Sequence, residues 1–345
     1  MKKQILMIAI SAMVALTAFG PKESAETASG EISNSLFAIT LPAECEGTYE
    51  ADVQDQQITI YHKESKDAGY GGMAFTVWAR EMPNEYAGGP YVKKGEIQDS
   101  KGNKYEVVLG YATEVQWNYE QSEQAPQSYE ALYDAAESVV ENMTGVDGAT
   151  FEYGAGTKGE DIYGDIVEKY KTAAAEGWDA TEYEENEMSP EIFILAQDGD
   201  LSDIGIAYYD VNLDGIDEML VGTLKDDELK GAIYDIYTTV DMVPTHVISG
   251  SARDRYYVYN KTFLVNEYSG GAMEYGKNVY DLSANSTELF LQWATKYDAY
   301  ENENQPWFIG YSDEDWENVT EEDFNNREAA TDDYVQLKFK SLSEL

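Results

Sequence analysis

Short segments in which apolar and β-branched residues alternate or cluster run along the first half of the chain. These segments are residues 36–41, 57–62, 72–80 and 105–111. Segments of this kind, separated by turn residues, are typical of antiparallel strands, and the Ser-Lys-Gly-Asn stretch at 100–103 supplies a hairpin turn before the last of them. The pattern therefore predicts an antiparallel sheet.

One amphipathic helix is predicted after these strands. Its apolar residues recur at spacings of three and four, which places them on one helix face. They are Leu132, Ala136, Val139 and Met143. Ser128 is expected to cap the start of the helix and Gly145 to end it. A single helix covering a sheet is the simplest fold for this half.

The second half begins with helical patterns and continues with short β-type segments. The run 161–175 carries an apolar stripe, and Ser189-Pro190-Glu191 has the residues of a helix start. Strands are expected at 204–209, 219–223, 232–240, 245–248, 256–259, 262–267, 278–282, 289–297 and 334–339. Thr320 with Asp323 predicts a last short helix. The fold class expected is α+β, with two domains that are each a mainly antiparallel sheet with one or two covering helices.

Composition changes divide the 345 residues further. Residues 1–20 have a Met-Lys-Lys start and an apolar run, which indicate a secretory signal peptide, and 21–34 have the composition of a flexible tether. We expect one domain at 35–147 and the other at 161–345, joined by a Gly-rich linker at 148–160. The linker contains a formal G-x-G-x-x-G, but no parallel strand-helix-strand unit surrounds it, so a dinucleotide site is not expected.

Charge and rare residues limit the function classes. The formal net charge is -43, which disfavours nucleic acid and anionic membranes as partners and fits cations or neutral ligands; a solvated acidic surface explains the same charge. Cys45 is the only cysteine, so no internal disulfide is possible. The two histidines, His62 and His246, lie far apart in the sequence, so zinc chemistry is not expected.

The stretch at 210–218 carries the most specific chemistry. It reads Asp-Val-Asn-Leu-Asp-Gly-Ile-Asp-Glu, and a sharp turn at Gly215 brings the oxygens of the alternating residues together. An oxygen-only shell of this kind suits calcium. The candidate ligands are Asp210, Asn212, Asp214, the Ile216 carbonyl and Glu218. Position twelve is Val221, so an EF-hand is not predicted, and the β-type flanks favour a hairpin tip. The alternative is an acidic turn that uses Asp and Asn for local hydrogen bonds.

This loop resembles the calcium loop of integrin-type FG-GAP repeats, and the resemblance implies the same five ligands. The first half resembles the PsbP-like α/β sandwich modules of exported bacterial proteins through its strand order, Tyr61-His-Lys63, Gly71-Gly72 and the final helix. That likeness implies a compact binding or scaffolding module without a catalytic residue to transfer.

The chain as a whole is similar to a family of two-domain secreted lipoproteins of Gram-positive bacteria that have no established activity. The loop, followed by Ile233-Tyr-Asp-Ile-Tyr237 and Arg255-Tyr-Tyr257, carries the likeness. Phe19 stands where the lipidated cysteine of that family is expected, so no thioether anchor can form there. Whether the signal segment is removed or stays as an anchor is left open.

Two functions from different classes follow. The first is a secreted or cell-envelope calcium-binding protein, surface-associated or extracellular, that is not an enzyme and binds a glycan or another envelope component, with calcium in a structural role. The second is a secreted carbohydrate-active hydrolase that uses paired carboxylates in an aromatic cleft. The aromatic residues for such a cleft would include Trp307, Tyr311 and Trp316.

Overall fold

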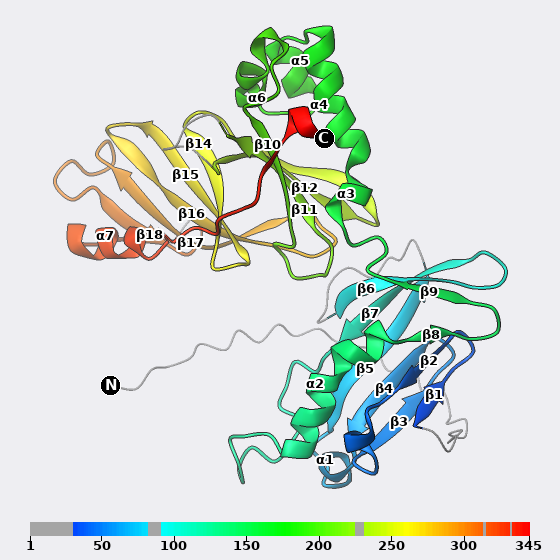
Figure 1. The fold of residues 1–345 in the computed structure, drawn as a ribbon. Coiled ribbons are helices and arrows are strands. Elements are labelled where there is room, and N and C mark those ends of the chain that lie inside the picture. The colour runs from blue at the N-terminus through cyan, green and yellow to red at the C-terminus, as the bar shows by residue number, and fades with distance from the viewer. Residues whose placement is uncertain (1–29, 82–90, 225–230, 313–314, 332) are drawn as a thin grey trace.

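The computed structural model describes residues 30–81, 91–224, 231–312, 315–331 and 333–345. The expected signal peptide at 1–20 lies outside the described residues, as does the expected tether up to residue 29. The secondary structure is mostly antiparallel sheet, and a few helices cover parts of the sheets, which agrees with an α+β or a mainly β fold (Figure 1). None of the helices in these ranges is long and apolar enough to span a membrane.

The first half forms a six-stranded antiparallel sheet with a three-stranded sheet beside it. The six strands, in spatial order, are β3 (Tyr49–Val53), β4 (Gln57–His62), β5 (Met73–Glu81), β7 (Lys104–Gly110), β6 (Tyr91–Gln98) and β9 (Thr150–Tyr153). The smaller sheet contains β1 (Glu31–Ser33), β2 (Phe37–Thr40) and β8 (Thr144–Gly145). The four strands predicted from the pattern are present, and β1, β3, β6 and β8 were missed.

Strand β1 corrects the expected tether at 21–34. Ile32 pairs with Ile39 across the small sheet and is buried, so the last residues of that segment belong to the fold. Similarly, β9 places part of the expected 148–160 linker in a sheet, where Phe151 pairs with Ile97.

The helix after these strands is α2 (Gln127–Glu141), and its termini differ from the prediction. Pro126 occupies the N-cap position without a side-chain cap, while the Ser128 hydroxyl instead lies 2.8 Å from His62 Nε2. Gly145 is not the helix end, because the helix stops at Glu141 and Gly145 is part of β8. The predicted apolar face is confirmed for Leu132, Ala136 and Val139, which are buried on α2, while Met143 is buried just beyond the end of the helix. A short helix, α1 (Lys63–Asp67), follows β4.

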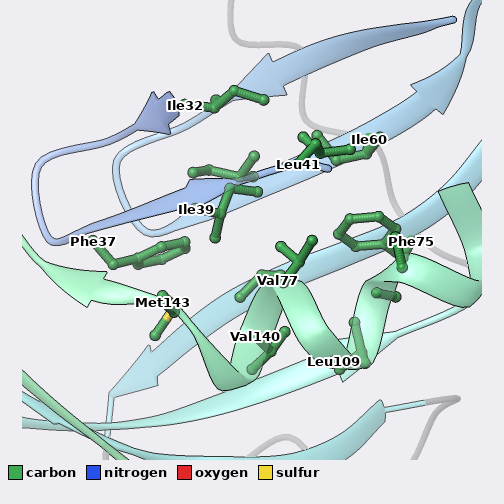
Figure 2. Packing of buried hydrophobic residues seen from close by; sticks show 14 of the residues in the cluster. Ile32, Phe37, Ile39, Leu41, Ile60, Phe75, Val77, Leu109, Val140 and Met143 are labelled. Carbon is green, nitrogen blue, oxygen red and sulfur yellow. The ribbon is translucent and has the colours of Figure 1, made fainter. Parts of the chain in front are cut away.

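Helix α2 and the two sheets of the first half share one hydrophobic core (Figure 2). Phe37 and Ile39 of β2 lie beside Ile60 and Phe75 of the larger sheet, and Val140 faces them from the helix. The buried members of this core all lie between residues 32 and 143. The sole cysteine, Cys45, is buried in it.

Shortening Ile39 to Val tests whether the small sheet shares this core. Because Ile39 is 1% exposed, the Ile39→Val change is expected to lower the free energy of unfolding by about 0.5–1.5 kcal/mol. Urea unfolding measures the difference. The matched control is Ile194→Val, which removes the same methylene from a side chain that is 51% exposed and is expected to change stability by less than about 0.5 kcal/mol. Equal effects of the two changes would contradict the shared core.

The second half is built on an eleven-stranded antiparallel sheet. Its strands, in spatial order, are β19 (Trp316–Asn318), β18 (Trp307–Gly310), β17 (Leu289–Asp298), β16 (Glu274–Leu282), β15 (Phe263–Gly271), β14 (Asp254–Tyr259), β12 (Ile233–Val240), β11 (Glu218–Thr223), β10 (Ile204–Tyr209) and β20 (Lys340–Ser341), and β13 (Val243–Ser249) also pairs with β12. The predicted antiparallel meander is confirmed for this part. Strands β18 and β19 were missed, because they are only four and three residues long.

Short helices cover the β10–β12 end of this sheet (Figure 1). They are α3 (Gly159–Ile162), α4 (Gly164–Glu176), α5 (Ala180–Glu185) and α6 (Pro190–Leu195). The predicted start of α6 is confirmed, since the Ser189 hydroxyl accepts a hydrogen bond from the Glu191 amide. These helices and β10–β12 share one hydrophobic core. Another core lies on the opposite face of the same strands, so β12 is covered on both sides.

The C-terminal segment confirms one prediction and corrects another. Helix α7 (Glu321–Ala329) begins at Thr320, whose hydroxyl accepts a hydrogen bond from the Asp323 amide, as the sequence predicts. The strand expected at 334–339 is not formed. Its alternating apolar residues pack against a core on the face of the sheet, and only Tyr334 makes a β-bridge, with Tyr259. The alternation of apolar and polar residues here indicates that one side of the segment is buried, although the segment does not pair as a strand.

Candidate metal centre

The acidic loop, defined as residues 210–218, lies at the tip of the β10–β11 hairpin. The two strands pair antiparallel up to Tyr209 and Glu218, which confirms the hairpin predicted from the flanking segments. Leu213 and Gly215 have positive φ angles of 58° and 90°, and these two residues turn the chain. Only glycine fits at the second position, because a Cβ on Gly215 would overlap the carbonyl oxygen of Lys93.

Three side-chain oxygens of the loop accept hydrogen bonds from its own backbone. Asp210 Oδ2 accepts from the Gly215 amide at 3.0 Å, and Asn212 Oδ1 accepts from the Asp214 amide at 3.0 Å. Asp214 Oδ1 accepts from the Ile216 amide at 2.8 Å. These bonds shape the turn and occur equally in an acidic turn without a metal, so they do not separate the two interpretations of the loop.

Glu218 is the most deeply buried acid of the loop, with 1% of its surface exposed. Its carboxylate accepts hydrogen bonds from the Val211 amide at 2.7 Å, from the Thr238 hydroxyl at 3.0 Å and from the Asn212 side-chain amide at 3.1 Å. A carboxylate offers about four lone-pair sites, so one remains after these three bonds. Glu218 therefore holds the loop to β12, and its carboxylate has one lone pair left for a metal ion.

The loop concentrates buried negative charge. Burial raises the pKa of Asp210, Asp214 and Glu218 above their usual ranges, and the negative charge of a neighbouring carboxylate adds to the effect, namely Asp217 for Asp210, Asp210 for Asp214, and Asp214 for Glu218. Within the described part of the chain, none of the three forms a direct ion pair with a Lys or Arg side chain, although the charge of the Lys93 ammonium interacts with Asp214. Three buried carboxylates near a single ammonium group are costly, and a divalent cation would offset that cost.

Two buried polar atoms near the loop have no hydrogen-bond partner among the described residues. They are Asp210 Oδ1 and the hydroxyl oxygen of Tyr163. Tyr163 is completely buried and stacks on Tyr208 with the ring centroids 6.3 Å apart. Burial, followed by the negative charge of Glu218 and Asp214, raises the pKa of Tyr163. Orphaned buried polar atoms are rare, and an ion together with a bound water would satisfy both.

The predicted ligand set is thus confined to one short loop, with different local roles for its members. Asp210 contributes a free oxygen, Asn212 and Asp214 each use one oxygen within the turn, and Glu218 is largely engaged by other donors. In the described ranges, no three His, Cys, Asp or Glu side chains are grouped so that they would hold a metal by themselves. The structure therefore does not bring Asp210, Asp214 and Glu218 together as a group of three metal-binding carboxylates.

Sequence reasoning missed the surroundings of the loop. Thr238, Tyr163 and Lys93 all contact or face it from remote positions in the chain. Asp217, which was not chosen as a ligand, accepts a hydrogen bond from the Gly159 amide at 3.2 Å. No local motif marks Thr238, Tyr163 or Lys93, and the glycine-rich stretch was interpreted only as a linker.

The aromatic residues considered for a sugar-binding cleft are not gathered into one platform. Trp307 and Gly310 are three positions apart on β18 and therefore lie on opposite faces of the sheet. Trp316 pairs with Gly310, so Trp307 and Trp316 are also on opposite faces. Trp307 packs edge-on against Tyr297, whereas Trp316 lies under the Lys296 ammonium, 4.9 Å from the ring centre. Tyr311 faces the Arg327 guanidinium. Each ring has its own local partner.

Comparisons of this chain with protein-family models, with curated proteins and with solved structures find no match.

Proposed function

We propose that this protein is a secreted or cell-envelope calcium-binding module in which the acidic loop binds one calcium ion in a structural role. The single observation that carries the proposal is the unpartnered, buried Asp210 Oδ1 among carboxylates whose pKa values are raised by burial and mutual repulsion. Asp210, Asn212, Asp214, the Ile216 carbonyl and Glu218 are the proposed ligands. The ion would hold β10 to β11 and supply the charge that the loop lacks.

The finer division of the fold belongs to the same proposal. We propose a first domain at 35–147, extended at its start by β1, and a second at 161–345. Support comes from the cores, since the first core draws its buried members from residues 32–143 and the other two from residues 163–342. The likeness to two-domain secreted lipoproteins agrees with this division. The net charge of -43 favours a neutral or cationic partner, such as a glycan of the envelope, over an anionic one.

Calorimetric titration of the full chain with calcium tests the site directly. We expect one site with a dissociation constant of about 0.1–1 mM, the range of extracellular calcium modules, and much weaker binding of magnesium, which demands a tighter octahedral shell. The Asp210→Asn change is expected to weaken calcium binding at least about tenfold, because it removes the charge of a carboxylate whose buried Oδ1 has no hydrogen-bond partner.

The matched control is Asp134→Asn, an identical chemical change at an exposed position on α2, which is expected to leave the titration unchanged. If the wild-type protein releases or absorbs no heat and shows no saturable binding at 10-fold the upper value of this range, about 10 mM calcium, the proposed function is wrong.

A further inference from the structure

We propose that the acidic loop also couples the two large sheets, so that calcium binding and the docking of β6 onto the loop strengthen each other. This inference rests on the proposed calcium site. It concerns Lys93 of β6 as a residue that positions the loop through its main chain, and the segment 157–159 as a second support. Neither belongs to the proposed ligand set.

The first contact is between β6 and the centre of the loop. The Lys93 amide donates a hydrogen bond to the Asp214 carbonyl oxygen at 2.6 Å. Next to it, Gly215 packs directly on the Lys93 backbone, with the amide nitrogen of Lys93 only 2.8 Å from the place where a Cβ would be. Asp214 thus presents its carboxylate to the loop interior while its carbonyl is held by the other sheet.

The second contact is between the loop and the segment that precedes α4. The Asp217 amide donates to the Thr157 carbonyl at 2.9 Å, and the Gly159 amide donates to Asp217 Oδ2 at 3.2 Å. Gly159 itself lies against the ring of Tyr208, on β10, with no room for a side chain. The segment therefore fixes Asp217, which lies between the proposed ligands Ile216 and Glu218.

The Lys93 side chain ties the same place to a third element. It is buried, and its ammonium donates to Glu96 Oε1 at 3.1 Å and lies 3.6 Å from Met242 Sδ, at the turn between β12 and β13. A buried ammonium with a carboxylate partner has few alternative positions. Glu96 is on β6 itself, so the contact with Met242 is the one that joins β6 to the β12–β13 turn.

Because of these contacts, one conformation of the loop does two things. It presents the ligand oxygens, and it docks against β6 and the segment 157–159. Without a cation, repulsion between the buried carboxylates favours loosening of the loop, and the contacts loosen with it. Binding equilibria that share one conformation are linked reciprocally, with typical coupling of about 5- to 150-fold. Calcium should therefore protect main-chain groups that are far from the loop in sequence.

Amide hydrogen exchange of the full chain, in calcium and in chelator, tests the coupling. We expect the amides of Lys93 and Gly159, both outside the loop, to exchange at least about fivefold more slowly in calcium. The amides of β3 and β4, in the same sheet as Lys93 but distant from the loop, are the internal control and should not change. Slowing confined to loop amides such as Gly215 and Ile216 would overturn the coupling while leaving the calcium site intact. No slowing at any amide, together with no calorimetric binding, would overturn both.

A variant outside the ligand set provides the reciprocal test. Gly159→Ala forces a methyl group against the Tyr208 ring and is expected to weaken calcium binding at least about fivefold. Gly164→Ala is the matched control, because nothing lies within 4 Å of the added methyl group. If both variants bind calcium as the wild type does, the coupling is wrong. If Gly159→Ala does not fold, the exchange experiment on the wild type still decides the matter.

Discussion

Replacing Asp235 by Asn is expected to lower the free energy of unfolding by about 3 kcal/mol or more, in calcium and in chelator alike. Asp235 is completely buried on β12. Its carboxylate accepts hydrogen bonds from the Tyr170 hydroxyl at 2.6 Å, from the Ser189 amide at 3.0 Å and from the Ser249 hydroxyl at 2.5 Å. An Asn side chain has the same shape but turns a donor toward these donors, so at least one buried bond is lost and one repulsion is gained.

The large effect follows from what these bonds connect. Tyr170 is on α4, Ser189 caps α6, and Ser249 ends β13, so one carboxylate fixes two helices and a strand to the centre of the sheet. The Ser189 hydroxyl continues the network to the Gly250 carbonyl at 2.8 Å. Hydrogen bonds to a charged acceptor contribute about 1.5–3 kcal/mol each, and leaving buried donors unsatisfied costs a similar amount.

Urea unfolding measured by tryptophan fluorescence and by circular dichroism checks this expectation. Asp134→Asn, at an exposed position of α2, is the control and should change the unfolding free energy by less than about 0.5 kcal/mol. A loss of less than about 1 kcal/mol in Asp235→Asn would show that the network does not hold the helices to the sheet.

The role of Asp235 could not be predicted from the sequence. In the stretch Ile233-Tyr-Asp-Ile-Tyr237 it reads as one polar residue among strand formers, and a meander strand normally leaves one face to solvent. In the structure β12 is buried on both faces, because helices cover one side and a second apolar core covers the other. Alternation along one strand carries no information about a covering layer that comes from elsewhere in the chain.

Local chemistry, by contrast, was sufficient for the hairpin. The strand predicted at 204–209 has those bounds in the structure, and its partner begins one residue earlier than predicted, because turn residues and β-formers within a few positions determine both. The contacts that place the loop in the molecule come from Lys93 and Gly159, more than fifty residues away from Asp217. Such long-range contacts leave no periodic signal, which is why the loop was predictable and its surroundings were not.

The second large effect is expected from Asp214→Asn in the same loop, which should raise stability without calcium and lower it with calcium. In chelator, Asp214→Asn is expected to be more stable than the wild type, because it removes one of three buried carboxylates whose repulsion and desolvation raise their pKa values. In calcium the order reverses. At a concentration of about 100 times the dissociation constant, binding stabilises the wild type by about 2.7 kcal/mol, and a variant with a charge removed from the ligand set loses most of that gain.

The pH dependence in chelator gives the same interpretation an independent check. A carboxyl group with a raised pKa in the folded state contributes stability that is complete below its ordinary pKa, 3.8 for Asp, and is lost as the pH rises through the folded value. The chelated wild type should therefore lose stability from these groups as the pH rises toward neutrality, and Asp214→Asn should lose less. Calcium needs the deprotonated carboxylates, so its stabilising effect should grow over the same interval.

Thermal unfolding of the wild type, Asp214→Asn and the control Asp134→Asn, each in calcium and in chelator at pH 5 and pH 8, separates these terms. The control should follow the wild type in all four conditions, which removes any contribution from the change in net charge alone. If Asp214→Asn is less stable than the wild type in chelator as well as in calcium, its carboxylate is already satisfied without an ion. The loop would then be an acidic turn held by its own hydrogen bonds, because only an uncompensated charge makes neutralisation favourable in the absence of the metal.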